Sequence, residues 1–185
     1  MPLPEYHPQS LSRTAWHFID GWRDRDVFDL DPPYQRSSVW DDEQRRQLIR
    51  SLQMGLPIGA VWTSDRGAAS DPPYGVVDGR QRIATLRAWF AGGFSVPADW
   101  FALRARQVER GYPPHLVDGH GDEVTFDDLT VVGARTCASW KVAELQVSGL
   151  TVEQEAELFL LINAAGTAHT AADLDRARQV AGGAG

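Results

Sequence analysis

Residues 78–82, which read Asp-Gly-Arg-Gln-Arg, place one carboxylate and two guanidinium groups around a glycine. The planar guanidinium groups of Arg80 and Arg82 are suited to phosphate oxygens. The carboxylate of Asp78 could hold Mg²⁺ or a ribose hydroxyl. This set of side chains therefore predicts a site for the phosphates of a nucleotide.

The flanking sequence predicts a strand before this turn and a helix after it. Tyr74–Val77 reads as a short buried strand, and Arg80–Phe90 reads as a helix because Ile83, Leu86 and Phe90 recur at helical spacing. Gly92-Gly93 is predicted to end the helix. The first N–H groups of a helix have no partner within it and lie at its positive end, which favours an anion there.

A structural interpretation of the same turn stands beside the chemical one. Asp78 could simply cap the helix, with Arg80 and Arg82 solvated on its first turn. The turn also lacks the GxxxxGK[ST] and GxGxxG patterns of phosphate loops and dinucleotide folds. Taken alone, these five residues favour the structural interpretation slightly.

The composition limits the classes of protein that fit. A chain of 185 residues with 43% hydrophobic content predicts a lead-in over residues 1–10, a single domain over 11–181 and a frayed tail over 182–185. The formal charge of −7 argues against a protein that mainly neutralises a nucleic-acid backbone. Its one cysteine, Cys137, excludes an internal disulfide and is expected to be a packing residue. The chain lacks a signal peptide and an apolar run of about 20 residues, so we expect a cytoplasmic protein without membrane contact.

Further elements are predicted from periodicity and capping. We expect a helix over Leu11–Asp24, which carries Phe18, Ile19 and Trp22 on one side. Capping signals at Asp41 and Thr151 predict two more helices. The remaining predictions are strands at Val27–Leu30, at Ile58–Thr63 and through Ala143, Leu145 and Val147, a short helix at Phe126–Leu129, and a last helix from near Thr170 towards Val180.

Three segments in this order resemble the N-terminal, DGQQR-motif domain of GmrSD-type modification-dependent restriction enzymes, which is related to the ParB and sulfiredoxin fold. The first is Pro33-Tyr34-Gln35-Arg36 with Trp40, followed by Ser51, Gly55 and Pro57. The second is Asp78-Gly79-Arg80-Gln81-Arg82 with Thr85 and Leu86. The third, Phe159 to Asn163 followed by Gly166-Thr167, is similar to the family's F-x-x-I-N-x-x-G-T segment. The resemblance covers roughly Leu11 to Val180.

The resemblance implies an α/β fold of the ParB/sulfiredoxin kind, with a small mixed sheet surrounded by helices and with C-terminal helices. It implies a site that binds, and could hydrolyse, a nucleoside triphosphate with Mg²⁺. Carried over by position, the catalytic residues would be Asp78, Gln81 and Arg82, with Asp78 also holding the metal. The residues that bind the nucleotide would be Tyr34, Gln35, Arg36, Gly79, Arg80 and Asn163.

Each of these roles has a structural alternative. Arg36 could form an ion pair with Asp78 instead of contacting phosphate. Tyr34 and Trp40 could pack the helix that begins at Asp41 rather than stack on a base. Asn163 could cap the end of its helix.

The chain departs from the family pattern in ways that bear on function. Arg80 stands where the family commonly has glutamine, and no cysteine matches the catalytic one of sulfiredoxin. The five histidines form no His-Asn-His cluster for DNA cleavage, so we expect no nuclease activity from this chain and a separately encoded nuclease or effector chain as a partner.

Two rival functions remain. One is a DNA-binding or modified-DNA-sensing module that uses Arg45, Arg46 and Arg50. The other is a catalytically inactive subunit for protein interaction.

Overall fold

The structure is a computed structural model, and it describes residues 5–20, 25–35, 40–102, 116–118, 121–164 and 178–182. The elements in chain order are β1 (Gln9–Thr14), η1 (Ala15–Phe18), β2 (Phe28–Asp29), α1 (Asp42–Gln53), β3 (Val61–Asp65), β4 (Tyr74–Asp78), α2 (Arg80–Phe90), β5 (Val96–Pro97), η2 (Ala98–Phe101), β6 (Glu123–Val124), η3 (Phe126–Asp128), α4 (Val131–Ala138), β7 (Lys141–Ser148) and α5 (Val152–Ala164).

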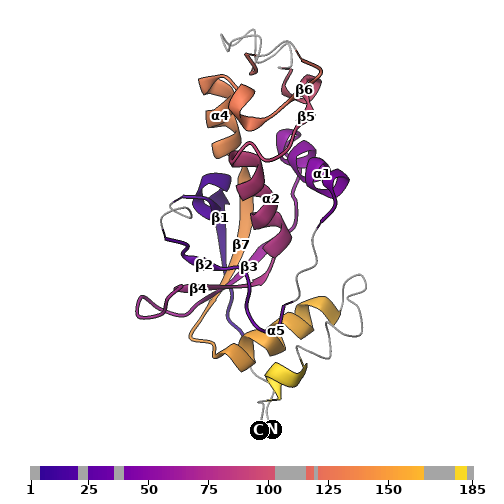
Figure 1. Cartoon of the computed structure of the whole chain (residues 1–185). Helices are drawn as coiled ribbons and strands as arrows, with labels where there is room; N and C mark the ends of the chain where they lie inside the picture. Colours follow the sequence, from indigo (N-terminus) through magenta and orange to yellow (C-terminus); the bar gives the residue numbers. More distant parts are fainter. Residues whose placement is uncertain are drawn as a thin grey trace.

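A five-stranded mixed sheet in the order β1-β7-β3-β4-β2 is the centre of the fold, and β5 pairs with β6 in a second, two-stranded sheet. Strand β7 is antiparallel to β1 and parallel to β3, whereas β4 is antiparallel to β3 and parallel to β2. Helix α4 and the small sheet lie at one end of the large sheet, and α5 lies at the other (Figure 1). The predicted α/β class is confirmed.

Two clusters of buried side chains lie against this sheet. The larger one joins Val61, Val76 and Val142 of the strands to Ile49 of α1 and Leu86 of α2. The smaller one packs α5 against the sheet through Val77, Val147, Ala156 and Phe159. The neighbours Val76 and Val77 therefore belong to different clusters, as expected where successive side chains of a strand point to opposite faces.

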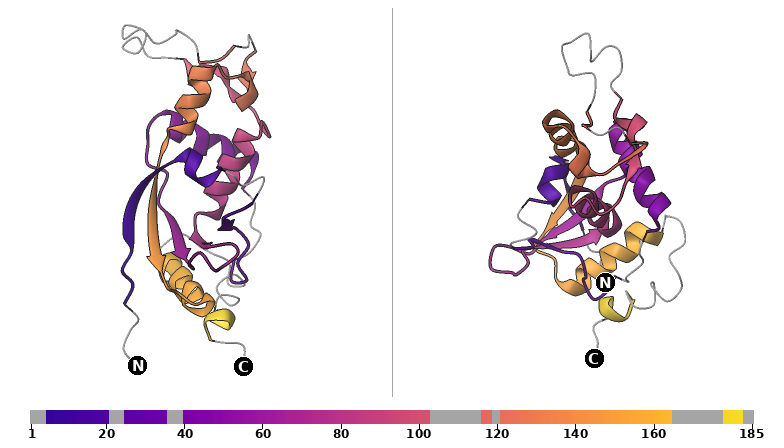
Figure 2. Two further views of the ribbon diagram at one scale, coloured as in Figure 1. Left: turned by 90° about the vertical axis from the view of Figure 1, so that its left-hand side faces the viewer. Right: turned by 45° about the horizontal axis from the view of Figure 1, so that its top comes forward.

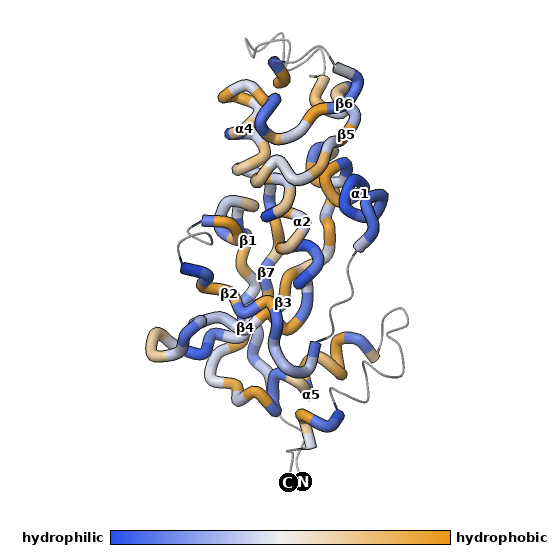
Figure 3. Tube along the Cα trace, viewed as in Figure 1, coloured by the Kyte–Doolittle hydropathy of each residue, from blue (hydrophilic) through white to orange (hydrophobic). Residues whose placement is uncertain are grey.

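Helices α1, α2 and α5 form where the sequence predicted them. Asp41 caps α1 through a capping box with Gln44, and Thr151 exchanges the corresponding hydrogen bonds with Gln154 before α5. Leu48, Ile49 and Leu52 are buried as expected. Hydrophobic residues of α1 face the rest of the protein, and hydrophilic residues follow its outer side (Figure 3). In α2, Trp89 is fully buried, whereas Phe90 is only partly buried.

The helix predicted over Leu11–Asp24 is wrong in its first part. Residues Gln9–Thr14 form β1, an edge strand that pairs along its whole length with β7, and the short η1 is the one helix that follows it in the described part of this range, which ends at residue 20. Figure 2 shows β1 and β7 side by side as two long curved strands. Local periodicity suggested a helix, but the pairing partner lies about 130 residues away in the sequence, as the register Ser12↔Ala143 shows.

Other predictions are confirmed with shifted bounds. The predicted strand Ile58–Thr63 is β3, which begins at Val61, and Cys137 is a buried free thiol. The strand through Ala143 is β7, but its buried side chains are those of Val142, Glu144 and Val147. Most of the helix predicted from Thr170 lies outside the described residues. No helix in the ranges that the structure describes has the length and apolar character needed to cross a bilayer.

Candidate functional site

A β-bulge precedes the Asp-Gly turn. In the ladder between β3 and β4, Trp62 lies opposite Asp78 while Thr63 lies opposite Val76, so Val77 is an extra residue on β4. A bulge bends its strand and changes the direction of the neighbouring side chains, and bulges are frequent beside active sites. Here it sets the direction in which β4 delivers Asp78.

Gln35 holds this bulge. Its side-chain amide nitrogen donates to the carbonyl oxygens of Val76 and Val77 over 2.6 and 2.7 Å, and its side chain is buried. A turn in which the Gln35 N–H donates to the carbonyl of Pro32 precedes it. The first family segment therefore contacts, through a buried amide, the strand that leads into the second segment.

Gly79 makes the turn from β4 into α2. Its φ of +98° lies in the left-handed region, and a Cβ there would lie 3.0 Å from both Arg82 Nη1 and Val61 Cγ2. Gly79, and not Asp78, is the N-cap residue of α2. The helix itself provides no acceptors for its first N–H groups.

Asp78 and Arg82 lie on the two sides of this turn and form an ion pair. Arg82 Nη1 donates to Asp78 Oδ2 over 3.2 Å and to the carbonyl oxygen of Ala60 over 3.1 Å. Their side chains retain 27% and 22% exposure, respectively. The pair is therefore fixed in direction and still open to solvent.

The other two motif residues on α2 also have partners. Arg80 forms an ion pair of 3.1 Å with Asp31, whose side chain is 80% exposed. Gln81 accepts a hydrogen bond from the backbone N–H of Trp40 over 3.2 Å. Gln81 thus fixes the backbone just before α1. The exposed ion pair between Arg80 and Asp31 is one that solvent can easily replace.

Tyr34 belongs to a buried polar network rather than to the open turn. Its hydroxyl donates to Glu155 Oε2 over 3.1 Å, and Arg66 donates to both oxygens of Glu155 and to Asp29. Burial, followed by the charge of Glu155, raises the pKa of Tyr34. The hydrogen bonds to Glu155 raise the pKa of Arg66. The network joins β2, the β3–β4 connection and α5 behind the turn.

The third family segment lies against the first. The rings of Tyr34 and Phe159 are 5.8 Å apart, and α5 packs on β4. Asn163 donates from Nδ2 to the carbonyl oxygen of Phe159, one turn earlier in α5, over 2.8 Å. Arg36, Gly166 and Thr167 lie outside the described residues, so the expected position of Arg36 beside Asp78 stays a prediction.

The arginines of the rival DNA-binding interpretation contact other parts of the protein. Arg45 lies 3.7 Å from Asp42, Arg46 lies 3.2 Å from Glu123, and the guanidinium of Arg50 lies over the ring of Trp100 at 5.6 Å. The contacts of Arg46 and Arg50 connect α1 to its neighbours, whereas the Arg45 contact lies within α1. The role of the three arginines in DNA binding stays a prediction.

Two buried carboxylates were not predicted. Glu155 is fully buried in α5, and Glu144 of β7 accepts hydrogen bonds from Arg13 and Thr63, both over 2.7 Å. Each acid stands at an inward position, Glu155 just before Ala156 on the apolar side of its helix and Glu144 on the core face of its strand. An acid at such a position signals a buried ion pair.

The chemistry of the donors limits how a metal could be held. In the described ranges no group of three or more His, Cys, Asp or Glu side chains could hold a metal ion. Mg²⁺ usually keeps several waters and takes one or two carboxylates plus the phosphates of its substrate. Asp78 at the turn fits this type of binding, in which the nucleotide supplies the remaining oxygens.

Comparison with known proteins agrees with this arrangement of segments. The family described as GmrSD restriction endonuclease, N-terminal domain, matches residues 18–178, which include all three segments. Neither the curated proteins nor the solved structures gave a match. Because the match covers most of the sequence, the chain belongs to the family of N-terminal domains of GmrSD restriction endonucleases and represents a component of a restriction system.

Proposed function

We propose that this chain binds a nucleoside triphosphate at the turn between β4 and α2 and acts as the regulatory domain of a restriction or phage-defence system. The observation that carries the proposal is the partly exposed Asp78–Arg82 pair at the N-terminus of α2, held by a bulge that Gln35 fixes. Preorganised donors of this kind suit the charge of a transferred phosphoryl group.

The phosphates would take the place of carboxylates that now neutralise the arginines. Asp31 is largely exposed, so Arg80 can exchange it for a phosphate oxygen at little cost. Arg82 stays fixed by the carbonyl of Ala60 while its guanidinium turns other N–H groups to the ligand. Gly79 allows the sharp turn that presents the first N–H groups of α2 to the phosphates, because its φ of +98° suits a residue without a side chain.

Mg²⁺ would be held by Asp78 together with phosphate oxygens and water. When bound, the ion neutralises part of the negative charge on the phosphates. Asp78 would then orient the ion or the attacking water, and Arg82 would stabilise charge that develops during hydrolysis. Gln81 and Gln35 would keep these two residues in position, and Tyr34 and Asn163 would support the segments behind them.

The proposed partner is the nuclease part of the restriction system, which would act on DNA. In this view the triphosphate controls the nuclease and the present domain does not cleave DNA itself. Direct DNA contact by the chain would appear as affinity that falls steeply with salt.

Calorimetric titration with each of the four ribonucleoside triphosphates, with and without Mg²⁺, tests the proposal. At least one triphosphate should bind the wild-type protein, and Arg82→Ala should weaken that binding by roughly tenfold or more. Arg25→Ala is the matched control, because Arg25 is an exposed arginine paired with Asp71. No binding to the wild type, or equal binding to Arg82→Ala, would contradict the proposal.

A further inference from the structure

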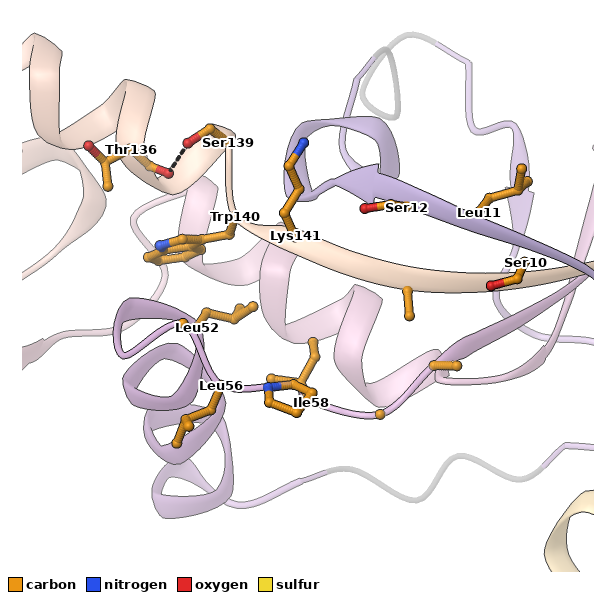
Figure 4. A pocket seen from close by; sticks show the side chains of 15 residues that line it. Ser10, Leu11, Ser12, Leu52, Leu56, Ile58, Thr136, Ser139, Trp140 and Lys141 are labelled. Atoms are coloured by element: carbon orange, nitrogen blue, oxygen red, sulfur yellow. Dashed lines mark hydrogen bonds between the residues drawn. The ribbon is translucent and has the colours of Figure 1, made fainter.

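A cavity of about 770 Å³ lies between strands β1 and β7 and the segment of residues 55–60 that joins α1 to β3. Figure 4 shows Trp140, Leu52, Leu56 and Ile58 on one side of it, and Ser10, Ser12 and Lys141 on the strands at the other side. Its volume is in the range typical of sites for small organic molecules. Of the residues named in the three family segments, Gly55 and Pro57 line it, whereas Asp78, Arg82 and the other residues of the candidate site at the turn are not among the lining residues.

The topology of the sheet opens this cavity. Strand β3 begins at Val61, which lies opposite Glu144, so β3 leaves the first residues of β7 without a ladder partner on that side. Residues 56–60, which precede β3, are not part of a strand. On β7, Lys141 and Ala143 are exposed, whereas Val142 and Glu144 between and after them face the core. The cavity therefore uses a surface that the core does not need.

The charge of the residues that line the cavity favours an anionic ligand. The whole chain has 25 acidic and 18 basic residues, yet none of the fifteen lining residues is acidic. The one charged residue among them is Lys141, which is also the only lysine of the sequence. We propose that this cavity binds a small organic anion whose aromatic or aliphatic body packs against Trp140, Leu56 and Ile58 and whose anionic group meets Lys141.

The strand register supports this orientation. Ser12 lies opposite Ala143 and Thr14 lies opposite Lys141, so the ammonium group and the Ser12 hydroxyl come from neighbouring positions on the same exposed face. Both are hydrogen-bond donors for a carboxylate. The side chains of Leu52, Leu56 and Ile58 come from α1 and the following segment, opposite the strands, and Trp140 stands directly before β7 (Figure 4). The cavity thus has a polar side and an apolar side, as an amphipathic ligand requires.

The cavity wall also offers a way to detect occupancy. Gly59 and Ala60 line the cavity, and the Ala60 carbonyl oxygen accepts a hydrogen bond from Arg82 Nη1 over 3.1 Å. An occupant that rests on this backbone should shift the Nε–H resonance of Arg82 in an NMR spectrum. This signal requires no nucleotide.

The test uses 1-naphthoate as the anionic probe and 1-naphthamide as its neutral counterpart, with calorimetry on the full chain. Ala143→Phe places a ring in the cavity from an exposed position, and Ser12→Phe does the same from β1 should the first variant fail to fold. Lys141→Gln removes the positive charge. Arg135→Gln is the control, since Arg135 is an exposed cation on the neighbouring α4 that does not line the cavity.

Naphthoate should bind with one-to-one stoichiometry and more tightly than naphthamide. Lys141→Gln should weaken naphthoate by about threefold, a filling variant should weaken it by roughly tenfold or more, and Arg135→Gln should leave it unchanged. Absence of saturable binding to the wild type overturns the proposal, as does unchanged binding to the filled variant. Equal or tighter binding of naphthamide also overturns it, because the cavity would then be an apolar site without preference for anions.

Discussion

The side-chain amide of Gln35 donates to the carbonyl oxygen of Val77 over 2.7 Å, and Val77 is the extra residue of the bulge that leads into Asp78. This hydrogen bond joins the first family segment to the strand, about forty residues later in the sequence, that leads into the second segment. Gln35 is buried, but through this bond it can position a turn that is open to solvent. Gln35 fixes the strand from which Asp78 and Gly79 emerge.

Replacement of Gln35 by leucine should therefore destabilise the protein. Two buried carbonyl oxygens would lose a donor, which should lower the free energy of unfolding by about 2 kcal/mol. Urea denaturation measures this loss. Gln9→Leu, at an exposed position on β1, is the control and should change stability by less than about 0.5 kcal/mol. Equal effects of the two substitutions would show that the amide does not hold the bulge.

Two tyrosines that donate to α5 carboxylates should differ in their contribution to stability. Tyr34 is fully buried and donates to Glu155 over 3.1 Å, whereas Tyr6 is partly exposed and donates to Glu157 over 3.4 Å. Tyr34→Phe leaves a buried carboxylate short of one donor and should cost about 1–2 kcal/mol. Tyr6→Phe should cost less than about 0.5 kcal/mol. A smaller loss for Tyr34→Phe than for Tyr6→Phe in thermal or urea unfolding would contradict the network described here.

Cys137 should make stability depend on alkaline pH. Burial raises the pKa of its thiol from 9.0 to about 12, so the folded state keeps a proton that the unfolded state loses. The contribution of the protonated thiol to the free energy of unfolding is complete below pH 9.0. It is lost as the pH rises towards 12, with a limiting slope of about 1.4 kcal/mol per pH unit. Unfolding by urea between about pH 8 and about pH 10 should show this decline in the wild type and less of it in Cys137→Ala. Parallel curves for the two proteins would exclude a contribution from the thiol.

Two glycines with nearly equal positive φ angles should separate strain from contact with Arg82. Gly59 has φ of +83° and Gly67 has φ of +84°, but a Cβ at Gly59 would lie 3.1 Å from Arg82 Nη2, while one at Gly67 would meet nothing within 4 Å. Alanine at either position should cost about 1 kcal/mol of stability. Only Gly59→Ala should also weaken triphosphate binding, by roughly three- to tenfold, because it displaces the guanidinium. The same affinity for both variants would show that the position of Arg82 does not matter for the ligand.

Local signals in the sequence were sufficient for α1, α2 and α5, because their capping residues and apolar spacing act within one or two turns. The strand β4 and the turn at Gly79 followed from the same kind of information. Strand β1 did not, since the residues that make it a strand rather than a helix are those of β7, far along the chain. Pairing at such a distance leaves no local periodicity to read.

The segments of the candidate site could be recognised from the sequence, but their contacts could be predicted only in part, and the roles of the site residues stay predictions. The Asp-Gly turn and the three family segments were evident, and the structure brings Tyr34, Gln35, β4 and Phe159 together. The interaction partners of these residues were not predicted. Arg82 forms an ion pair with Asp78, four residues earlier, and Tyr34 donates a hydrogen bond to Glu155 from another segment. The bulge at Val77 arises from the register of two strands, and no residue type in the sequence predicts it.

The most direct test of the account is a crystal structure of the protein with Mg²⁺ and a non-hydrolysable analogue of the triphosphate that binds best. If the triphosphate binds at the turn between β4 and α2, its phosphate oxygens should lie within hydrogen-bonding distance of Arg82 and of the first N–H groups of α2, with Asp78 beside the ion. A triphosphate bound elsewhere on the chain, with the Asp78–Arg82 pair unchanged, would contradict it.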